Sequence, residues 1–292
     1  MIKAKAHTSV LVREVLQVFE GKEIRLFFDG TVGAGGHASA LLEAHPEIER
    51  YVGCDRDPTA LALAGKALEA WGEKVELVRG DYADMPRMIG KDCIDGFLID
   101  IGVSSMQLDE RERGFSFMGD APLDMRMDPE GELTAAEVVN RYGEAELARI
   151  FFEYGEERRS RQVAKAIVEA RRKRKIRTTG ELVEIIKPVA TRGRLHPATL
   201  VFQALRIVVN DELGQLQRGL TAAIEKTCPE GRIAAISFHS LEDRIVKNAF
   251  RDAKGVLKIL TKKPIGPTAE ETRANPRSRS AKLRAAEKLG SI

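Results

Sequence analysis

Three glycines follow a short apolar run near the start of the chain, a spacing that suits a cofactor pocket. Leu26–Phe28 predicts a buried strand that ends at Asp29, and Gly33, Gly35 and Gly36 precede helix-forming sequence. Glycines let backbone amides approach a ligand closely, and in an open α/β sheet the ligand lies beyond the carboxyl end of the strand. The stretch therefore predicts a nucleotide-type pocket.

Two classes of cofactor suit this loop. Gly33-x-Gly35-x-x-Ala38, with Asp55 further on to hold a ribose, fits the dinucleotide fingerprint. Asp29 favours the other class, because a carboxylate beside the loop would repel a pyrophosphate but attract the sulfonium and ammonium of S-adenosylmethionine. A simple Asp-Gly turn without a ligand is the third interpretation. The loop alone leaves all three open.

Carboxylates recur where predicted strands end. Asp29, Asp55 and Asp100 each close a strand, and Asp81 follows another. The carboxyl ends of parallel strands meet at one edge, so these side chains should line one site. The spacing places Asp55 for ribose hydroxyls, Tyr82 beside an adenine ring and Asp100 where the reactive group projects.

A later strand, residues 231–240, brings Ser237 and His239 to the same predicted edge. A single histidine is more often a structural hydrogen-bonding residue than a catalyst. Its position at a strand end nevertheless makes His239, with Ser237, a candidate for catalysis or substrate contact.

The alternation of strands and helices predicts a parallel α/β sheet. The strand signal disappears between residues 133 and 210, where helical periodicity takes over, so we expect a helical domain inserted into the sheet domain. The expected division is 1–110 with 211–292 for the sheet domain and 111–210 for the insertion. The predicted strands are residues 26–28, 51–55, 75–78, 94–100, 231–240 and 256–260.

Two features of the insertion suggest nucleic acid. Arg171, Arg172 and Arg174 belong to a dense basic run that we expect to contact phosphates. Phe115 and Phe117 lie in a long loop punctuated by glycine and proline, and long loops are often functional. The two rings could cover a pocket or pack beneath the loop.

The whole chain sets further bounds. It has 292 residues, 43% hydrophobic content and a net charge of +3, which is ample for a core. Cys54, Cys93 and Cys228 have no paired spacing, so we expect a reducing compartment, no disulfide framework and no metal site. No run reaches membrane-spanning length, which predicts a soluble cytoplasmic protein without membrane partners. A homodimer is left open.

Together, these segments resemble the bacterial small-subunit ribosomal RNA cytosine-N4 methyltransferases. The similarity spans nearly the whole chain in order, which makes the set far more specific than the glycine loop alone. The matching stretches are His7–Leu11, Asp29–His37, Asp55–Pro58, Asp100–Asp109, Arg113–Met118, Pro122–Pro129, Tyr154–Glu157, His196–Thr199, Phe202–Arg206, Ser237–Arg244 and Asn275–Arg279.

The resemblance implies a class I, Rossmann-like methyltransferase sheet with an inserted all-helical domain. It also implies S-adenosylmethionine as donor and, as acceptor, a cytosine in the decoding region of 16S rRNA or the small ribosomal subunit. By position, Gly35, Gly36 and His37 would hold the methionine end of the cofactor, and Asp100 and Gln107 would complete its site. Met106, where the family often has proline, leaves these polar positions intact.

The predicted reaction is methyl transfer to the exocyclic N4 of cytosine, with Asp100 accepting a hydrogen bond from that amine. Phe115 and Phe117 are candidates to stack on the extruded base, and Arg244 joins the basic helices as a candidate RNA contact. Three alternatives remain: an NAD-dependent oxidoreductase, a non-catalytic ribosomal RNA-binding assembly factor, and a DNA cytosine-N4 methyltransferase.

Overall fold

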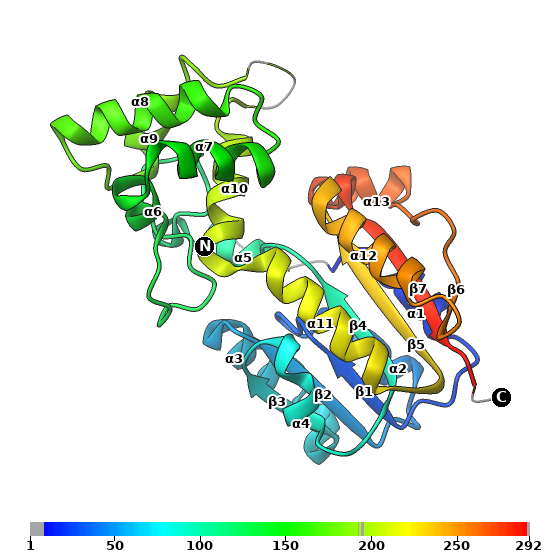
Figure 1. Cartoon of the computed structure of the whole chain (residues 1–292). Coiled ribbons are helices and arrows are strands. Elements are labelled where there is room, and N and C mark those ends of the chain that lie inside the picture. Colours follow the sequence, from blue (N-terminus) through cyan, green and yellow to red (C-terminus); the bar gives the residue numbers. More distant parts are fainter. Residues whose placement is uncertain (1–8, 192, 194–195, 291–292) are drawn as a thin grey trace. The chain divides into compact units, whose positions relative to one another are not determined.

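The computed structural model describes residues 9–191, 193 and 196–290, so His7 and Thr8 of the first matching stretch lie outside the described residues. The chain divides into two compact units (Figure 1). One, the sheet unit, extends up to Gly102 and resumes at Leu213; the other, the helical unit, is Val103–Glu212. The sequence placed these divisions at residues 110 and 210.

A seven-stranded sheet forms the centre of the sheet unit, in the order β3-β2-β1-β4-β5-β7-β6. Strands β1 to β5 are parallel, and β7 runs antiparallel between β5 and β6. The order reverses between β1 and β4, where ligands bind in open α/β sheets. The strands are β1 (Leu26–Asp29), β2 (Arg50–Asp55), β3 (Val75–Arg79), β4 (Ile94–Asp100), β5 (Thr227–Ser237), β6 (Leu257–Ile259) and β7 (Lys282–Lys288).

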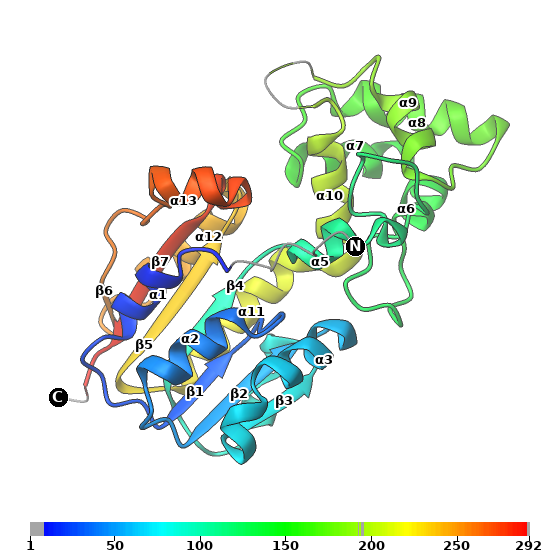
Figure 2. The same ribbon diagram turned by 180° about the vertical axis from the view of Figure 1, so that it is seen from behind.

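Helices cover both faces of the sheet, and successive residues of β1 pack alternately against the helices on one face and on the other. Phe27 belongs to the core cluster to which α1, α2 and α3 contribute, and Phe28 to the cluster with α4, α11 and α12. Figures 1 and 2 show these two sets of helices on opposite faces of the sheet. This alternation explains why residues 26–28 of β1 are all apolar, since each face of a covered parallel strand is buried. The helices are α1 (Val12–Phe19), α2 (Gly36–Ala44), α3 (Pro58–Ala67), α4 (Met85–Ile89), α11 (Glu212–Lys226), α12 (Ser240–Asp252) and α13 (Ala269–Ala274).

The sequence did not predict β7, since the last strand expected from it ends at residue 260. Lys282–Lys288 carries charged side chains and two alanines, which are poor strand formers. The structure places it inside the sheet and buries Arg284, whose guanidinium donates to both oxygens of Asp243 at 2.6 and 3.2 Å. Asp243 and Arg284 are far apart in the sequence, so no local pattern predicts this ion pair.

The helical unit has its own hydrophobic core, and its main helices agree with the predicted periodicity. Leu147, Ile150, Val163, Ile167 and Leu205 are among the buried residues that join its helices. Thr134 and Thr178 cap two of these helices with reciprocal side-chain bonds. The helices are α5 (Ser105–Asp109), α6 (Ala135–Arg141), α7 (Glu144–Glu153), α8 (Ser160–Lys173), α9 (Thr179–Ile186) and α10 (Thr199–Asn210).

The expectation about cysteines was wrong for two of the three. Cys93 and Cys228 form a disulfide with Cα atoms 5.1 Å apart, although 135 residues separate them in sequence. They lie just before β4 and near the start of β5, and because these strands pair in parallel their beginnings are neighbours. Spacing could not reveal this pairing. Cys54 is buried and takes no part in a disulfide.

No helix in the part of the chain that the structure describes is both long and apolar enough to cross a bilayer.

Candidate active site at the carboxyl edge of the sheet

The glycine loop joins β1 to α2 with backbone that side chains would disturb. Gly33 and Gly35 have φ values of +54° and +87°, a region that glycine occupies readily. At Gly36 an added Cβ would lie 2.1 Å from the Ser9 hydroxyl oxygen. The predicted strand, turn and helix are therefore all present, and the turn is closely packed against the start of the described chain.

Asp29 ends β1 as a buried carboxylate. One oxygen accepts a hydrogen bond from the Tyr51 hydroxyl at 2.8 Å, and the other accepts one from the Thr31 amide at 3.1 Å. Burial raises the pKa of Asp29 to about 7, although both hydrogen bonds oppose this rise. A positive charge nearby would favour the ionised form of this carboxylate.

Asp100 ends β4, the strand beside β1, and carries an unpartnered oxygen. Its backbone amide donates to the Thr31 hydroxyl at 2.6 Å, but Oδ1 is buried with no hydrogen-bond partner among the described residues. Burial, with repulsion from Asp29 and Glu242, raises the pKa of Asp100 to about 8. An unsatisfied buried carboxylate oxygen is costly, so the site suits a ligand that supplies a hydrogen-bond donor or a positive charge.

Asp55 and Tyr82 follow the next strands along the edge. The Asp55 oxygens accept the amides of Gly33 at 3.0 Å and Asp57 at 2.9 Å, which ties the end of β2 to the glycine loop. Tyr82 lies against glycines on two sides, because a Cβ at Gly30 or Gly219 would come within 2.7 or 2.4 Å of its side chain. The residues assigned to ribose and adenine therefore lie on the same edge as Asp29.

His37 links the loop to the start of the described chain. Its Nε2 lies 2.8 Å from the Val10 carbonyl oxygen, and the side chain is buried in α2. The next amide, that of Leu11, donates to Glu271 of α13 at 2.8 Å. The structure thus gives His37 a positioning contact, and its predicted contact with the cofactor stays a prediction.

The helix that follows β5, α12, contains Glu242 in its first turn, a residue that the sequence did not select. Its Oε2 accepts the amides of Phe238 and His239 at 2.8 and 3.2 Å, and its side chain is fully buried. His239 caps α12 with Nδ1, 3.4 Å from the Glu242 amide, and its Nε2 lies 2.9 Å from Oε1, out of line for a hydrogen bond. Both ring nitrogens of His239 therefore face Glu242.

Glu242 could have been found from the spacing His-x-x-Glu, which is that of a capping box with histidine at the first position. Ser237, the other catalytic candidate on this strand, is also buried, and its hydroxyl donates to the Lys282 carbonyl oxygen at 3.4 Å. The structure gives Ser237 a structural partner and His239 a capping contact through Nδ1, while Oδ1 of Asp100 and Nε2 of His239 make no hydrogen bond within the described residues.

Comparison with known proteins identifies the family. The model of the MraW methylase family matches residues 4–289. The chain is 50% identical to the ribosomal RNA small subunit methyltransferase H of Chlamydia felis, covering 100% of both chains, and 48% identical to that of Heliobacterium mobile, covering 97% of this chain and 99% of the other. This chain belongs to the MraW methylase family.

The fold has a counterpart among solved structures. The crystal structure of a candidate rRNA-methylase from Clostridium thermocellum matches with a TM-score of 0.50 at 12% identity, covering 96% of this chain and 98% of that one. At this identity the match shows the fold, which confirms the predicted Rossmann-like methyltransferase sheet.

Gln107 belongs to the helical unit of this family member. It closes a capping box at the start of α5: its side chain accepts from the Ser104 amide at 3.1 Å, and its own amide donates to the Ser104 hydroxyl at 3.2 Å. Its predicted cofactor contact stays a prediction.

The two phenylalanines proposed for base stacking differ in exposure. Phe115 is 7% exposed and packs into the core of the helical unit, so core packing accounts for it. Phe117 is half-buried and stacks on His196, with ring centroids 4.7 Å apart. Of the two, only Phe117 keeps surface that a base could contact without repacking the core.

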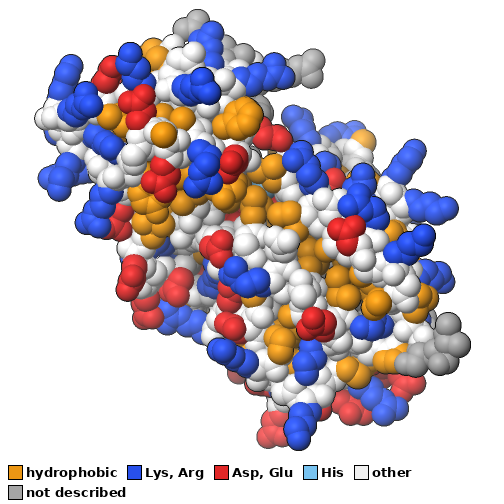
Figure 3. All heavy atoms as spheres, in the orientation of Figure 1, with side chains coloured by type: hydrophobic (Ala, Val, Ile, Leu, Met, Phe, Trp, Pro, Cys, Tyr) orange, Lys and Arg blue, Asp and Glu red, His pale blue; other side chains and the backbone are white. Residues whose placement is uncertain are grey.

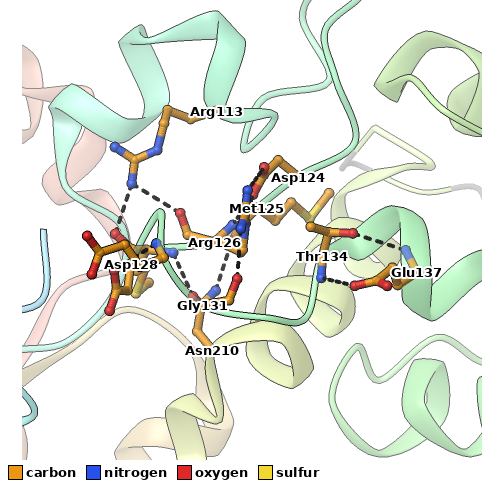
Figure 4. Close-up of polar contacts among 11 residues, drawn as sticks. Arg113, Asp124, Met125, Arg126, Asp128, Gly131, Thr134, Glu137 and Asn210 are labelled. Carbon is orange, nitrogen blue, oxygen red and sulfur yellow. Dashed lines mark hydrogen bonds and ion pairs between the residues drawn. The ribbon is translucent and has the colours of Figure 1, made fainter.

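The long loop around Met125 is held in one shape by polar contacts (Figure 4). Arg113 donates to the carbonyl oxygens of Arg126 and Met127 at 3.1 and 2.9 Å, and Arg126 makes a two-pronged pair with Asp124 at 2.8 and 2.7 Å. Asn210 of α10 accepts the Met127 amide at 2.7 Å. The predicted functional loop is therefore an ordered element of the helical unit.

The basic residues proposed for RNA contact differ in their exposure to solvent and in their contacts within the protein. Arg171 donates to the Val139 carbonyl oxygen at 2.7 Å, and Arg174 pairs with Glu181. Arg172 and Arg244 are exposed, the first on α8 and the second on α12 of the sheet unit. Of the predicted basic run, Arg171 is half-buried, whereas Arg172 and Arg174 are exposed, Arg174 even though it is paired.

Proposed function

We propose that this protein transfers a methyl group from S-adenosylmethionine to the exocyclic N4 of a cytosine in 16S rRNA. The observation that carries the proposal is the buried, unpartnered Oδ1 of Asp100 at the end of β4. It lies in a member of a methylase family whose relatives are named ribosomal RNA small subunit methyltransferases.

The residues at this edge fit the proposed donor. S-adenosylmethionine supplies an electrophilic methyl group on a positively charged sulfur. Asp29 and Asp100 provide negative charge that no cation among the described residues pairs with, Asp55 accepts ribose hydroxyls, and Tyr82 presents an aromatic side chain for the adenine. A dinucleotide would instead bring its pyrophosphate toward the glycine loop and these carboxylates.

The chemical work required of the protein is positioning and proton acceptance. Cytosine N4 is a weak nucleophile because its lone pair is delocalised into the ring. Asp100 accepts a hydrogen bond from N4, orients the amine, stabilises the positive charge that develops on it, and takes up the released proton. The raised pKa of Asp100, about 8, suits a proton acceptor near neutral pH.

The proposed acceptor is 16S rRNA, either free or within the small subunit, with its target base extruded from the stack. Exposed cations of α8 and the segment after it, such as Arg172, Lys173 and Lys175, support phosphate contact. Such contacts set affinity and salt dependence more than the choice of base.

Methyl transfer from labelled S-adenosylmethionine tests the proposal with three substrates: naked 16S rRNA, assembled small subunits and DNA. We expect N4-methylcytidine in RNA, identified by the mass of the released nucleoside. Label only in DNA would point to the DNA methyltransferase alternative. Donor and RNA binding without any transfer would support an assembly factor, and NAD binding in place of the methyl donor would support an oxidoreductase.

A further inference from the structure

The segment between β6 and β7 leads the chain to the reactive edge of the sheet. Leu260 and Thr261 donate their amides to the Ala285 carbonyl oxygen, and Ile265 pairs with Leu283, so the segment runs alongside β7 toward its first residue. In the antiparallel register with β5, Lys282 lies opposite Ser237. The start of β7, and the residues directly before it, therefore lie where β4 and β5 end.

Two anchors fix this segment. Glu271 of α13 accepts the Leu11 amide at 2.8 Å, and the neighbouring Val10 carbonyl contacts His37 of α2 at 2.8 Å, so α13 is tied to the helix that follows the glycine loop. Ser278 is fully buried, and its hydroxyl donates to the Asn275 carbonyl oxygen at 2.8 Å. The residues on either side of Ser278 are consequently turned toward solvent.

The exposed side chains of this anchored segment are predominantly basic. Residues 262–279 contain five cations and two carboxylates, and one carboxylate, Glu271, is engaged with the backbone. None of Lys262, Lys263 and Arg279 forms an ion pair within the described part of the chain. Figure 3 shows Lys and Arg side chains gathered over the side of the sheet unit where α13 lies. The exposed cations are Lys262, Lys263, Arg273, Arg277 and Arg279.

We propose that residues 262–279 form a phosphate-binding strip that holds the RNA backbone on the sheet unit itself, next to the base that reacts. The choice of RNA as partner rests on the function proposed above. A base that reaches Asp100 brings its own backbone across this edge, and the strip supplies positive charge there. Phosphate contacts of this kind fix the register of a nucleic acid without reading its sequence.

The strip belongs to the same compact unit as Asp29 and Asp100, so it can position RNA whatever the helical unit does. An anionic membrane is a poorer match, because a bilayer over this edge would exclude the nucleotide substrate. The basic run after α8 and this strip would then be two separate phosphate contacts, one on each unit.

The test compares two triple variants that remove equal charge from opposite edges of the sheet. Lys262→Gln/Lys263→Gln/Arg279→Gln neutralises the strip. Lys91→Gln/Arg251→Gln/Lys254→Gln neutralises exposed cations near the start of β4, in the last turn of α12 and directly after that helix, at the far edge. Binding of a fluorescent fragment of 16S rRNA is measured by anisotropy from 50 to 300 mM salt, without methyl donor. Methyl-donor affinity and melting temperature verify that each variant is folded.

We expect the strip variant to bind RNA about tenfold or more weakly at low salt. The slope of log affinity against log salt should fall by roughly 0.7 for each phosphate that the variant no longer binds, while the far-edge variant stays within about twofold of the wild type. An RNA affinity and a salt slope of the strip variant equal to those of the wild type would overturn the strip. A strip variant that bound RNA normally but lost binding to anionic vesicles would overturn it as well. Strip-dependent RNA binding without methyl transfer would keep the strip and reject the proposed function.

Discussion

The carboxylates at the edge of the sheet and the cations after α8 lie in opposite environments, one protected from solvent and the other exposed to it. Asp29 is buried and Asp100 has a buried Oδ1; they lie close enough that Asp29 raises the pKa of Asp100, and neither pairs with a cation among the described residues. Lys173 and Lys175 are exposed to solvent at the end of a helix. A buried charge without a partner costs far more than an exposed one.

This difference predicts how function is distributed. At the sheet edge, one atom of one residue decides whether the reacting group is held, so single substitutions should have large effects. On the basic segments, affinity is a sum of screened contacts, so each cation contributes little and salt changes the total. Substitutions in the two regions therefore differ in size, in pH dependence and in salt dependence.

The largest expected effect is that of Asp100→Ala. Because Asp100 is the proposed acceptor of the N4 hydrogen bond and proton, turnover should fall by about a hundred- to ten-thousandfold. Single-turnover methyl transfer to the best RNA substrate measures it. The control is Asp92→Ala, since Asp92 is an exposed aspartate just before the same strand. Full activity of Asp100→Ala would reject the assigned role.

Asp100→Asn should also stabilise the fold while it removes activity. The folded-state pKa of about 8 exceeds the unfolded value, so the folded protein binds more protons and this carboxyl opposes folding increasingly as pH rises toward 8. The melting temperature of the variant should therefore exceed that of the wild type more at pH 8 than at pH 5. The opposite trend would show that Asp100 is stabilised as a carboxylate in the folded protein.

The second effect concerns cofactor affinity and pH. Burial raises the pKa of Asp29 to about 7 and that of Asp100 to about 8, and a cationic ligand favours the ionised forms. Affinity for S-adenosylmethionine should therefore rise as pH increases from 6 to 8.5, and binding near pH 7 should release protons. Titration calorimetry in buffers of different ionisation enthalpy measures the release. Proton uptake on binding would contradict this account of the site.

Much of this edge could be predicted because local sequence specifies it. The apolar runs of β1 and β4 end in aspartates, and the glycines that follow β1 are needed where φ is positive. Parallel pairing then brings those strand ends together without further information. The positions of Asp29, Asp55 and Asp100 therefore followed from periodicity and topology.

What was missed depends on contacts between distant residues. Arg284 is tolerated inside the sheet because Asp243 pairs with it, and no local pattern of β7 reveals that partner. Cys93 and Cys228 meet because β4 and β5 are neighbours. Phe115 is an aromatic residue in a long loop, as expected of a residue that covers a ligand, but its side chain packs into the core of the helical unit. In each case tertiary packing overrode the local signal.

The third effect should be modest and dependent on salt. Lys173→Gln/Lys175→Gln removes two exposed cations that form no ion pair within the described residues, so RNA affinity should fall a few fold at low salt and converge with the wild type at high salt. Arg171→Gln is the informative partner, because it removes a hydrogen bond to the Val139 carbonyl oxygen and should lower the melting temperature as well. An RNA affinity that is reduced equally at all salt concentrations would indicate a structural role for the lysines.

The smallest effect on turnover is expected for Cys93→Ser. The disulfide joins the beginnings of β4 and β5, whereas Asp100 and Ser237 end these strands, so the reactive edge should be unaffected. A crosslink closing a loop of this length restricts the unfolded chain, so under oxidising conditions its loss should lower the free energy of unfolding by roughly 2–4 kcal/mol. Denaturant unfolding with and without dithiothreitol measures this, because reductant should bring the wild type to the level of the variant. If turnover instead fell with Cys93→Ser, the two ends of β4 would be coupled, and the separation of stability from chemistry along this strand would fail.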